Sequence, residues 1–478
     1  MKKLSLLSIV VIMVVCLFAV FPLSGCKTEQ AAETTAAAAE TTAAATTAAG
    51  ETTAAAETPE EVEVLPAMDI NVWDWQPGEN YLTAMKANFE AFKVKYPQYA
   101  NVNFIHNSVG ADYWTLLTPA VAAGEGVPEI FGILQSQTEL FDAMLDLRPI
   151  MSADEEWMAQ YKWIDTPDLG TSGLDDRVTG IAIDRWVAGI LYYKDMLEQY
   201  NLELPVYAED FIAMAPVLEK DGIEVMAMGG DSWVLEIMFA YMVQQLEGKP
   251  TNPAGVAKDW FTGDLKYDSE SSRIALQAIK DMWDGGVWRE DELQLFQFAE
   301  AIQNFQAKKA WGYWCGGTWW AGAQNPEDLE AGNIGVIPMA VPAGGDPGVA
   351  QASTGQPYGV YINIAPEKKQ VALDFIKFLS SPEAVKIYLE NQILPAGEIP
   401  EGMSSPNSLI NEMIAMGDAA SAAGLIYDPH QWDGALLEPV ADGITSVCLG
   451  MMTIDEALAG MRTAQDEVVA RIKEQRGQ

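Results

Sequence analysis

Short strand-like and helical stretches alternate between residues 69 and 134, and this alternation restricts the fold more than any other feature of the sequence. The strand-like stretches are rich in alternating or β-branched apolar residues and cover residues 69–75, 102–106 and 128–134. Apolar residues at helical spacing lie between them, over residues 82–96, which Pro97 ends, and over residues 114–123. This order is typical of a parallel sheet layered with helices, so we expect an α/β fold.

The rest of the chain continues the mixed pattern without an internal repeat. The predicted strands are two short ones within residues 177–193, around Asp184-Arg185-Trp186, and one each over residues 310–314, 335–338 and 358–364. Helices are predicted over residues 211–218, 231–246, 269–283 and 371–379, after the Ser381-Pro382 cap, and after the capping box of Thr453 and Glu456. We expect Trp283 in the core and Trp288 on the surface.

The first residues have the pattern of an export signal. Lys2 and Lys3 precede an apolar run from Leu4 to Phe21, which is also long enough for an uncleaved membrane anchor. The tetrad Leu23-Ser24-Gly25-Cys26 resembles the lipobox of bacterial lipoproteins. The resemblance implies a signal peptide over residues 1–25, a lipid such as palmitate on Cys26, and an extracytoplasmic protein held at the cell membrane.

Residues 26–66 are rich in Thr, Ala and Glu and have no apolar periodicity, so we expect a flexible tether after the lipidated Cys26. A flexible coil of about 40 residues spans roughly 35 Å. The whole chain has a formal net charge of −40. Nucleic-acid binding needs clusters of Lys and Arg, so this charge argues against a nucleic-acid partner.

Cysteine and histidine are scarce, which limits the chemistry of the chain. Cys16 leaves with the signal and Cys26 carries lipid, so Cys315 and Cys448 remain, either as one disulfide or as two buried thiols. The two histidines, His106 and His430, and the absence of CxxC and HExxH argue against zinc. We therefore expect neither a metal nor a cofactor.

Four segments resemble the extracellular solute-binding proteins of ABC importers, family 1, the maltose-binding-protein type. AGEGVPEI ending at Ile130 is similar to A-x-G-x-x-P-D-[IV], with Glu129 in place of Asp, and GILYYKDML ending at Leu197 is similar to L-Y-Y-N-K-D-L without the Asn. Residues 305–319 resemble F-x-x-G-K-x-A-M…G-x-W with Lys308 in place of the glycine, and residues 372–383 resemble A-x-E-F-I-K-F-L-x-S-x-E.

The resemblance implies two α/β lobes in a periplasmic-binding-protein-like fold of type II, with a hinged ligand cleft. The N-terminal lobe would hold residues 67–180 and 355–393, and the C-terminal lobe residues 181–354 and 394–478. The chain would cross between the lobes near residues 179–183, 343–354 and 392–397.

Aromatic residues are the main candidates for ligand contacts. A sugar offers C–H faces, which aromatic rings cover, and hydroxyls, which carboxylates and amides bind. All fifteen tryptophans lie after residue 72, and Asn304–Ala323 alone has Trp311, Trp314, Trp319 and Trp320. Within that stretch we expect Trp311 and Trp314 to pack and Trp319 to contact ligand. The full candidate set, each weighed against a place in the core or at a helix cap, is Trp319, Trp75, Asp184, Trp186, Trp233, Asp231, Gln135, Ser136, Trp320, Gln356, Tyr358 and Trp432.

These expectations favour a monomeric substrate-binding lipoprotein that captures a sugar or an oligosaccharide for ABC permease subunits, without catalysis. Two alternatives remain. The same fold could bind a polyamine, a peptide or a glycerol phosphodiester, or the chain could be a secreted glycoside hydrolase with paired carboxylates. The sequence has no GxxxxGK[ST] loop, so the energy for transport would come from a separate ATPase.

Overall fold

A computed structural model describes residues 63–76, 78–133, 138–160, 177–247, 260, 263–295, 300–315, 321, 324–355, 357–423, 426–427 and 434–475. All of them belong to one compact unit, residues 61–478. The predicted export signal, Cys26 and nearly all of the tether lie outside the described residues. None of the helices in these ranges is both long enough and apolar enough to cross a membrane.

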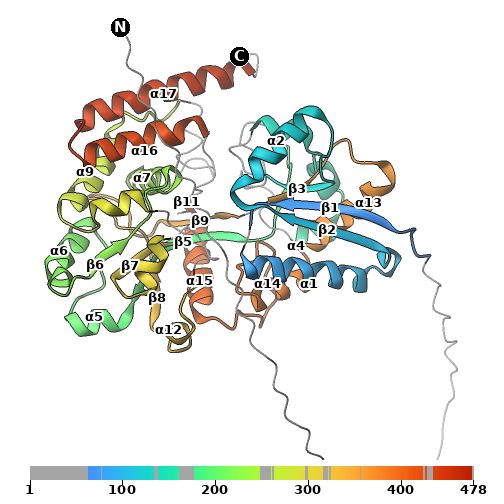
Figure 1. Ribbon diagram of the computed structural model, residues 1–478, viewed down its shortest axis with the longest axis horizontal. Coiled ribbons are helices and arrows are strands. Elements are labelled where there is room, and N and C mark those ends of the chain that lie inside the picture. Colours follow the sequence, from blue (N-terminus) through green and yellow to red (C-terminus); the bar gives the residue numbers. More distant parts are fainter. Residues whose placement is uncertain are drawn as a thin grey trace, which may run out of the picture. The chain divides into compact units, whose positions relative to one another are not determined.

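The first sheet has five strands in the order β2-β1-β3-β10-β4. Its strands β1, β2 and β3 are labelled in Figure 1. Their bounds are β1 Met68–Asp74, β2 Val102–Ser108, β3 Ile130–Gly132, β4 Ile181–Ala182 and β10 Pro357–Val360. β1 runs parallel to both β2 and β3, which confirms the predicted parallel arrangement, whereas β10 is antiparallel to β3 and β4. The strand predicted over residues 358–364 ends early, at Val360.

Helices flank this sheet, and the apolar spacing or the Ser381-Pro382 cap predicted four of them, but not the two short helices between residues 148 and 160. Their bounds are α1 Glu79–Lys95, α2 Tyr113–Ala123, α3 Arg148–Ser152, α4 Glu155–Gln160, α13 Pro366–Phe378 and α14 Pro382–Glu390. Short 3-10 turns are η1 Pro97–Tyr99, η2 Gly110–Asp112 and η3 Thr138–Ala143. Phe89 of α1 stacks on Phe104 at 4.6 Å between ring centroids and meets Phe375 of α13 at 5.3 Å, so aromatic contacts join α1 and α13 across β2.

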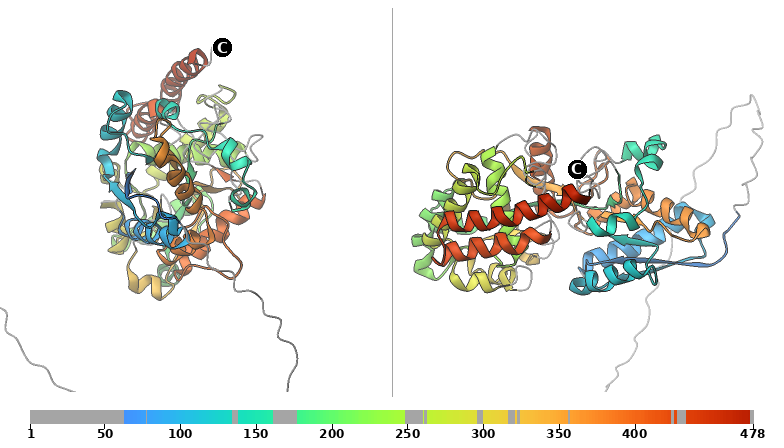
Figure 2. Two further views of the ribbon diagram at one scale, coloured as in Figure 1. Left: turned by 90° about the vertical axis from the view of Figure 1, so that its right-hand side faces the viewer. Right: turned by 90° about the horizontal axis from the view of Figure 1, so that it is seen from above.

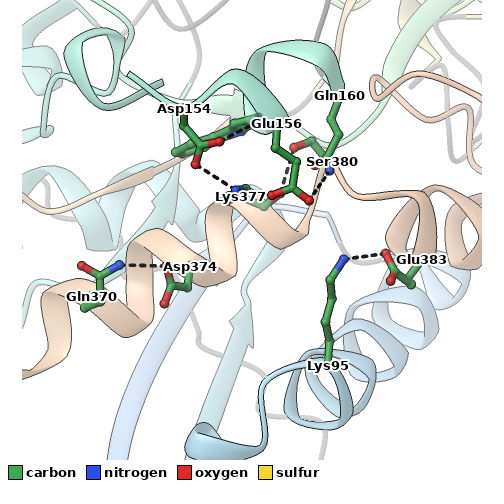
Figure 3. A network of polar contacts seen from close by, with 10 residues as sticks. Lys95, Asp154, Glu156, Gln160, Gln370, Asp374, Lys377, Ser380 and Glu383 are labelled. Carbon is green, nitrogen blue, oxygen red and sulfur yellow. Dashed lines mark hydrogen bonds and ion pairs between the residues drawn. The ribbon is translucent and has the colours of Figure 1, made fainter. Parts of the chain in front are cut away.

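Polar contacts fasten the outer helices of this sheet to one another (Figure 3). The ammonium of Lys377 on α13 lies 2.8 Å from an Asp154 carboxylate oxygen and 2.7 Å from one of Glu156 on α4. Lys95 at the end of α1 lies 2.9 Å from Glu383 on α14. Burial alone would lower the pKa of Lys377, but the hydrogen bonds that its ammonium donates to Asp154 and Glu156 outweigh burial and raise this pKa.

The second sheet has the order β11-β9-β5-β7-β6, with β8 also paired to β5. Its strands are β5 Arg185–Tyr193, β6 Glu224–Ala227, β7 Ala310–Cys315, β8 Ile334–Ile337, β9 Ala350–Thr354 and β11 Ile426–Tyr427. β5 pairs with β9 over its first four residues and with β8 over its last four. Gly189 lies at the change of partner, and a Cβ there would stand 2.3 Å from the carbonyl oxygen of Ile337.

The helices of this part are α5 Lys194–Tyr200, α6 Ala208–Leu218, α7 Ser232–Glu247, α9 Glu270–Asp284, α10 Ile302–Gln306, α12 Pro326–Glu330, α15 Ser408–Ala423, α16 Gly434–Cys448 and α17 Ile454–Gln475, with 3-10 turns η4 Glu219–Asp221 and η5 Glu290–Gln294. α7 is buried from Val234 to Gln245. Both α7 and α9 contact α16, which lies beside α17 (Figures 1 and 2).

The capping box predicted at the start of α17 is confirmed, because the backbone N–H of Thr453 donates to Glu456 Oε2 at 2.9 Å and the N–H of Glu456 donates to Thr453 Oγ1 at 3.2 Å.

Two expectations about single side chains change with the tertiary structure. Trp288, expected on the surface, is buried with 2 % of its area exposed, because the chain after α9 turns back and Val287 joins Met226 through a 3.1 Å backbone hydrogen bond. Trp283, expected in the core, is only partly buried against the same core.

Cys448 is a buried free thiol, so the alternative in which it forms a disulfide is wrong. Burial raises its pKa to about 12.

Candidate functional site

Three aromatic rings gather beyond the carboxyl end of β1. The Trp75 ring lies 5.5 Å from that of Tyr113 and 5.2 Å from that of Trp114, between centroids, and Tyr113 and Trp114 meet edge to face at 4.7 Å. Trp75 and Trp114 are partly exposed, whereas Tyr113 is buried and donates its hydroxyl to the Gly132 carbonyl at 2.7 Å. The buried Tyr113 thus packs against both partly exposed indoles.

Asp74 lies under these rings with 1 % of its area exposed. Its Oδ2 is 2.6 Å from His106 Nε2 and accepts a 2.5 Å hydrogen bond from the Tyr358 hydroxyl, and its Oδ1 accepts from the Gln76 N–H at 3.0 Å. Burial, and then the negative charge of Asp74, raise the pKa of Tyr358 well above its usual value. Tyr358 is a predicted site residue, and its hydroxyl is already bound within the protein.

Asp184 has 4 % of its area exposed and follows β4. Its carboxylate accepts a hydrogen bond from the Tyr81 hydroxyl of α1. Burial, followed by the charge of Asp184, raises the pKa of Tyr81 well above its usual value. The next residue, Arg185, donates from Nη1 to Asp418 at 2.6 Å and from Nε to the Pro395 carbonyl at 3.1 Å.

The second sheet carries a row of three indoles. Trp186 on β5 meets Trp233 on α7 edge to face at 6.3 Å, and Trp233 meets Trp314 on β7 at 6.0 Å. Trp186 and Trp233 are partly exposed, and Trp314 and its neighbour Trp311 are fully buried, which confirms the expectation that those two pack. Trp314 therefore packs against Trp233, and Trp233 packs against Trp186.

Asp231 directly precedes α7, a position that suits either a ligand contact or the N-cap of the helix. Its carbonyl oxygen accepts backbone hydrogen bonds from Val234 at 2.9 Å and Leu235 at 3.2 Å. Ser232 beside it donates its hydroxyl to Glu438 of α16 at 2.8 Å. The first turn of α7 is thus fixed to α16, and this contact positions Trp233.

Six of the twelve predicted ligand contacts, and Cys26, lie outside the described residues and stay predictions. In chain order, Gln135 and Ser136 follow β3, Trp319 and Trp320 follow β7, Gln356 separates β9 from β10, and Trp432 lies between β11 and α16.

Several site residues were missed in the sequence analysis. Tyr81, His106, Tyr113 and Trp114 were not proposed, although three of them carried a usable signal. His106 pairs with Val72 on the neighbouring parallel strand, two residues before Asp74, and side chains at adjacent strand ends lie together. Tyr113-Trp114 is an aromatic pair at the start of a helix close to the same edge. Among the described residues, no group of His, Cys, Asp and Glu is arranged to hold a metal ion.

One protein family matches more than half of the chain. Residues 77–386 match the family described as bacterial extracellular solute-binding protein. A search of curated proteins found no match.

Solved structures share the fold at low sequence identity. A chitin oligosaccharide binding protein matches with a TM-score of 0.70 and 19 % identity, over 84 % of this chain and 100 % of its own. The GacH receptor of Streptomyces glaucescens GLA.O, studied with acarbose, gives 0.66 and 17 %, over 85 % and 99 %. Maltose-bound MalE3 of T. maritima also gives 0.66 and 17 %, over 84 % and 99 %.

Proposed function

The chain belongs to the bacterial extracellular solute-binding proteins, and we propose that it binds a sugar or an oligosaccharide and delivers it to the permease of an ABC importer. We propose a sugar because partly exposed indole rings lie together in two places, Trp75 with Trp114 and Trp186 with Trp233. We call these two pairs the indole groups. Flat, partly exposed rings held from behind suit the C–H faces of pyranose rings. Titles of similar structures name chitin oligosaccharide, acarbose and maltose, which supports the same class.

The two sheets are the basis for a proposed division into two lobes. The N-terminal lobe would hold residues 67–180 and 355–393, and the C-terminal lobe residues 181–354 and 394–478. β4, Ile181–Ala182, pairs with β10 of the first sheet. This pairing supports a first crossing after Ala182, two residues later than the boundary at residue 180. The ligand would bind between the lobes and favour their closed arrangement, because only there do both lobes contact it.

Within this scheme the ligand contacts are Trp75, Trp186, Trp233 and Asp231, together with the six candidates that lie outside the described residues: Gln135, Ser136, Trp319, Trp320, Gln356 and Trp432. Asp184 and Tyr358 would act behind the site, since the carboxylate of the former and the hydroxyl of the latter already have partners within the protein.

The chain would act by binding, without breaking a bond, outside the cytoplasm. Its family consists of binding proteins, which supports this assignment. We further propose that residues 1–25 are removed, that lipid on Cys26 anchors the mature chain, and that residues 27–66 are its tether. Charge of −40 favours a monomer in solution through mutual repulsion.

Thermal-shift measurements on the full chain in detergent test the proposal. Chito-, malto- and xylo-oligosaccharides are compared with polyamines, peptides and glycerol phosphodiesters, and recovered ligand is analysed for products. A rise in Tm with one sugar series and intact ligand is expected, because a ligand that binds the native state stabilises it. Stabilisation by polyamines, peptides or phosphodiesters alone would move the chain to the non-sugar class, and cleaved sugar would identify a hydrolase.

A further inference from the structure

Three segments that are far apart in the sequence meet at Asp184. The Ala396 N–H donates to the Ile183 carbonyl at 3.1 Å, and the Arg185 N–H donates to the Leu394 carbonyl at 2.8 Å. Asp184 itself forms an isolated bridge with Pro395. From the third segment, the Gly355 N–H donates to the Asp184 carbonyl at 2.7 Å. We call residues 183–185, 355 and 394–396 the crossing node, because each segment lies where the chain is expected to pass between lobes.

The side chain of Asp184 extends this node to helix α1. Its carboxylate accepts from the hydroxyl of Tyr81, which is 5 % exposed and packs in the core of the first sheet. Gly355 leaves the space that this arrangement needs, because a Cβ there would lie 2.3 Å from Asp184 Oδ1. The Tyr81–Asp184 contact therefore joins a helix of the first sheet to all three segments of the node.

We propose that the Tyr81–Asp184 hydrogen bond is a latch that fixes α1 to the crossing node and so sets the preferred angle between the lobes before ligand arrives. This inference rests on the proposed function for its effect on affinity, but not for its effect on the ligand-free chain. Tyr81 and Asp184 are positioning residues: they act through the orientation of the two indole groups and do not touch the ligand.

The physical reason lies in the burial of the carboxylate. A buried carboxylate that loses a hydroxyl donor keeps its desolvation penalty with one compensating bond fewer, so the segment around it moves toward other donors or water. Because Asp184 is bonded through its own backbone to residue 355 and bridged to Pro395, such a movement displaces all three segments together. A change in the angle between lobes then lowers the fraction of chains that are ready to bind.

The chain supplies a matched control. Tyr99 donates its hydroxyl to Asp374, so it makes the same kind of bond on the same sheet (Asp374 is labelled in Figure 3). Tyr99 follows α1 in η1 and Asp374 belongs to α13, and neither residue belongs to a segment of the crossing node. Tyr99→Phe therefore removes an equivalent hydroxyl without touching any segment of the node.

The test uses the full chain with spin labels on exposed positions of α1 and α5, introduced as E90C and E198C, and measures the distance between labels without ligand. Tyr81→Phe is expected to shift or broaden this distribution, and to weaken binding of the sugar found by thermal shift about tenfold or more. Asp184→Asn keeps an acceptor for Tyr81 and is expected to retain the wild-type distribution, whereas Asp184→Ala behaves like Tyr81→Phe. Tyr99→Phe leaves distribution and affinity unchanged.

Circular dichroism and Tm establish that every variant is folded. An unchanged distribution in folded Tyr81→Phe, or an equal change in Tyr99→Phe, overturns the latch. If Tyr81→Phe does not fold, the distance distributions of Tyr81→Trp and Asp184→Asn are compared instead. A wild-type distance distribution in folded Tyr81→Trp then overturns the latch. If no sugar binds the wild type while the ligand-free distribution still responds to Tyr81→Phe, the latch stands and the proposed function fails.

Discussion

Glu236 lies in the middle of helix α7 with 1 % of its area exposed. Its Oε2 has no hydrogen-bond partner among the described residues, and burial raises its pKa to about 8. Burial, and then the charge of Glu236, also raise the pKa of the nearby Tyr267. The carboxyl group is therefore protonated in the folded chain at neutral pH, whereas an ordinary Glu in the unfolded chain is ionised.

Folding at neutral pH thus takes up a proton at Glu236, and its contribution to stability falls as pH rises from about 4.5 to about 8. Glu236→Gln removes this dependence. We expect the free energy of unfolding to increase by about 3 kcal/mol at pH 7 and by less than about 1 kcal/mol at pH 5. Urea unfolding at both pH values measures the difference. Glu198→Gln, on an exposed position of α5, is the control. An equal gain at both pH values would contradict the expected ionisation of Glu236.

Trp75 tests the indole group of the first sheet. Its ring is partly exposed and stacks beside Trp114, so Trp75→Ala should remove a flat contact surface and weaken sugar binding about tenfold to a hundredfold. Titration followed by tryptophan fluorescence gives the Kd. Trp283→Ala removes a partly buried indole from α9 and should leave the Kd unchanged. Wild-type affinity in Trp75→Ala would remove Trp75 from the proposed site.

At the scale of elements, strand β5 changes its partner from β9 to β8 at Gly189, which has no side chain. Gly189→Ala should place a Cβ against the Ile337 carbonyl of β8 and lower the free energy of unfolding by about 2 kcal/mol or more. Gly460→Ala offers a matched control, because a methyl group added at that position of α17 would meet no other atom within 4 Å and helix propensity favours alanine. Chemical unfolding should show Gly460→Ala equal to or more stable than the wild type. Equal stability of Gly189→Ala would show that β8 moves away without cost.

The short helix α4 is joined to α13 by Lys377, which contacts two carboxylates (Figure 3). Lys377→Met should lower the free energy of unfolding by about 1 kcal/mol, since the contacts are partly exposed to water and Asp154 and Glu156 would then repel each other. Lys386→Met removes an exposed lysine that lies 3.8 Å from Glu390, and it should change little. Salt titration separates the effects: the loss in Lys377→Met should shrink at high ionic strength.

At the scale of the whole molecule, the proposed anchor and tether determine where binding takes place. Cys26→Ala removes the sulfur that would carry lipid, so the chain should move from the membrane pellet to the soluble fraction or keep its signal uncleaved. Fractionation with mass spectrometry of the N-terminus measures both outcomes. Cys448→Ala removes a buried thiol and should stay in the membrane fraction. Membrane-bound Cys26→Ala with a cleaved N-terminus would exclude lipid on Cys26 as the anchor.

Lys308 shows how a departure from a family motif is accommodated locally. It stands where the family motif has glycine, and its φ of 56° is in the left-handed region that favours glycine. Its ammonium lies 2.9 Å from Asp328 and 4.8 Å from the ring centroid of Tyr193. These contacts offset part of the backbone strain of a lysine in the turn between α10 and β7.

Local sequence determined the elements that depend on neighbours along the chain. The end of α1 at Pro97, the Ser269 and Ser381 caps and the Thr453–Glu456 capping box arise from contacts over three or four residues, and each was predictable. Apolar periodicity likewise predicted the parallel β1–β2–β3 layer. Family motifs in the right order predicted the fold class.

Tertiary structure alone decided which polar groups satisfy one another and which aromatic rings are buried. Asp74 meets Tyr358 across 284 residues, and Asp184 meets Tyr81 across 103 residues, so neither pairing leaves a trace in local spacing. Trp288 looked like a surface residue until the turn after α9 folded it back. A strand or helix pattern specifies which face is apolar, but burial of a particular side chain depends on what packs against that face. Asp184, which the sequence offered as a ligand contact, is buried and bonded to Tyr81, and we therefore propose it as part of the latch.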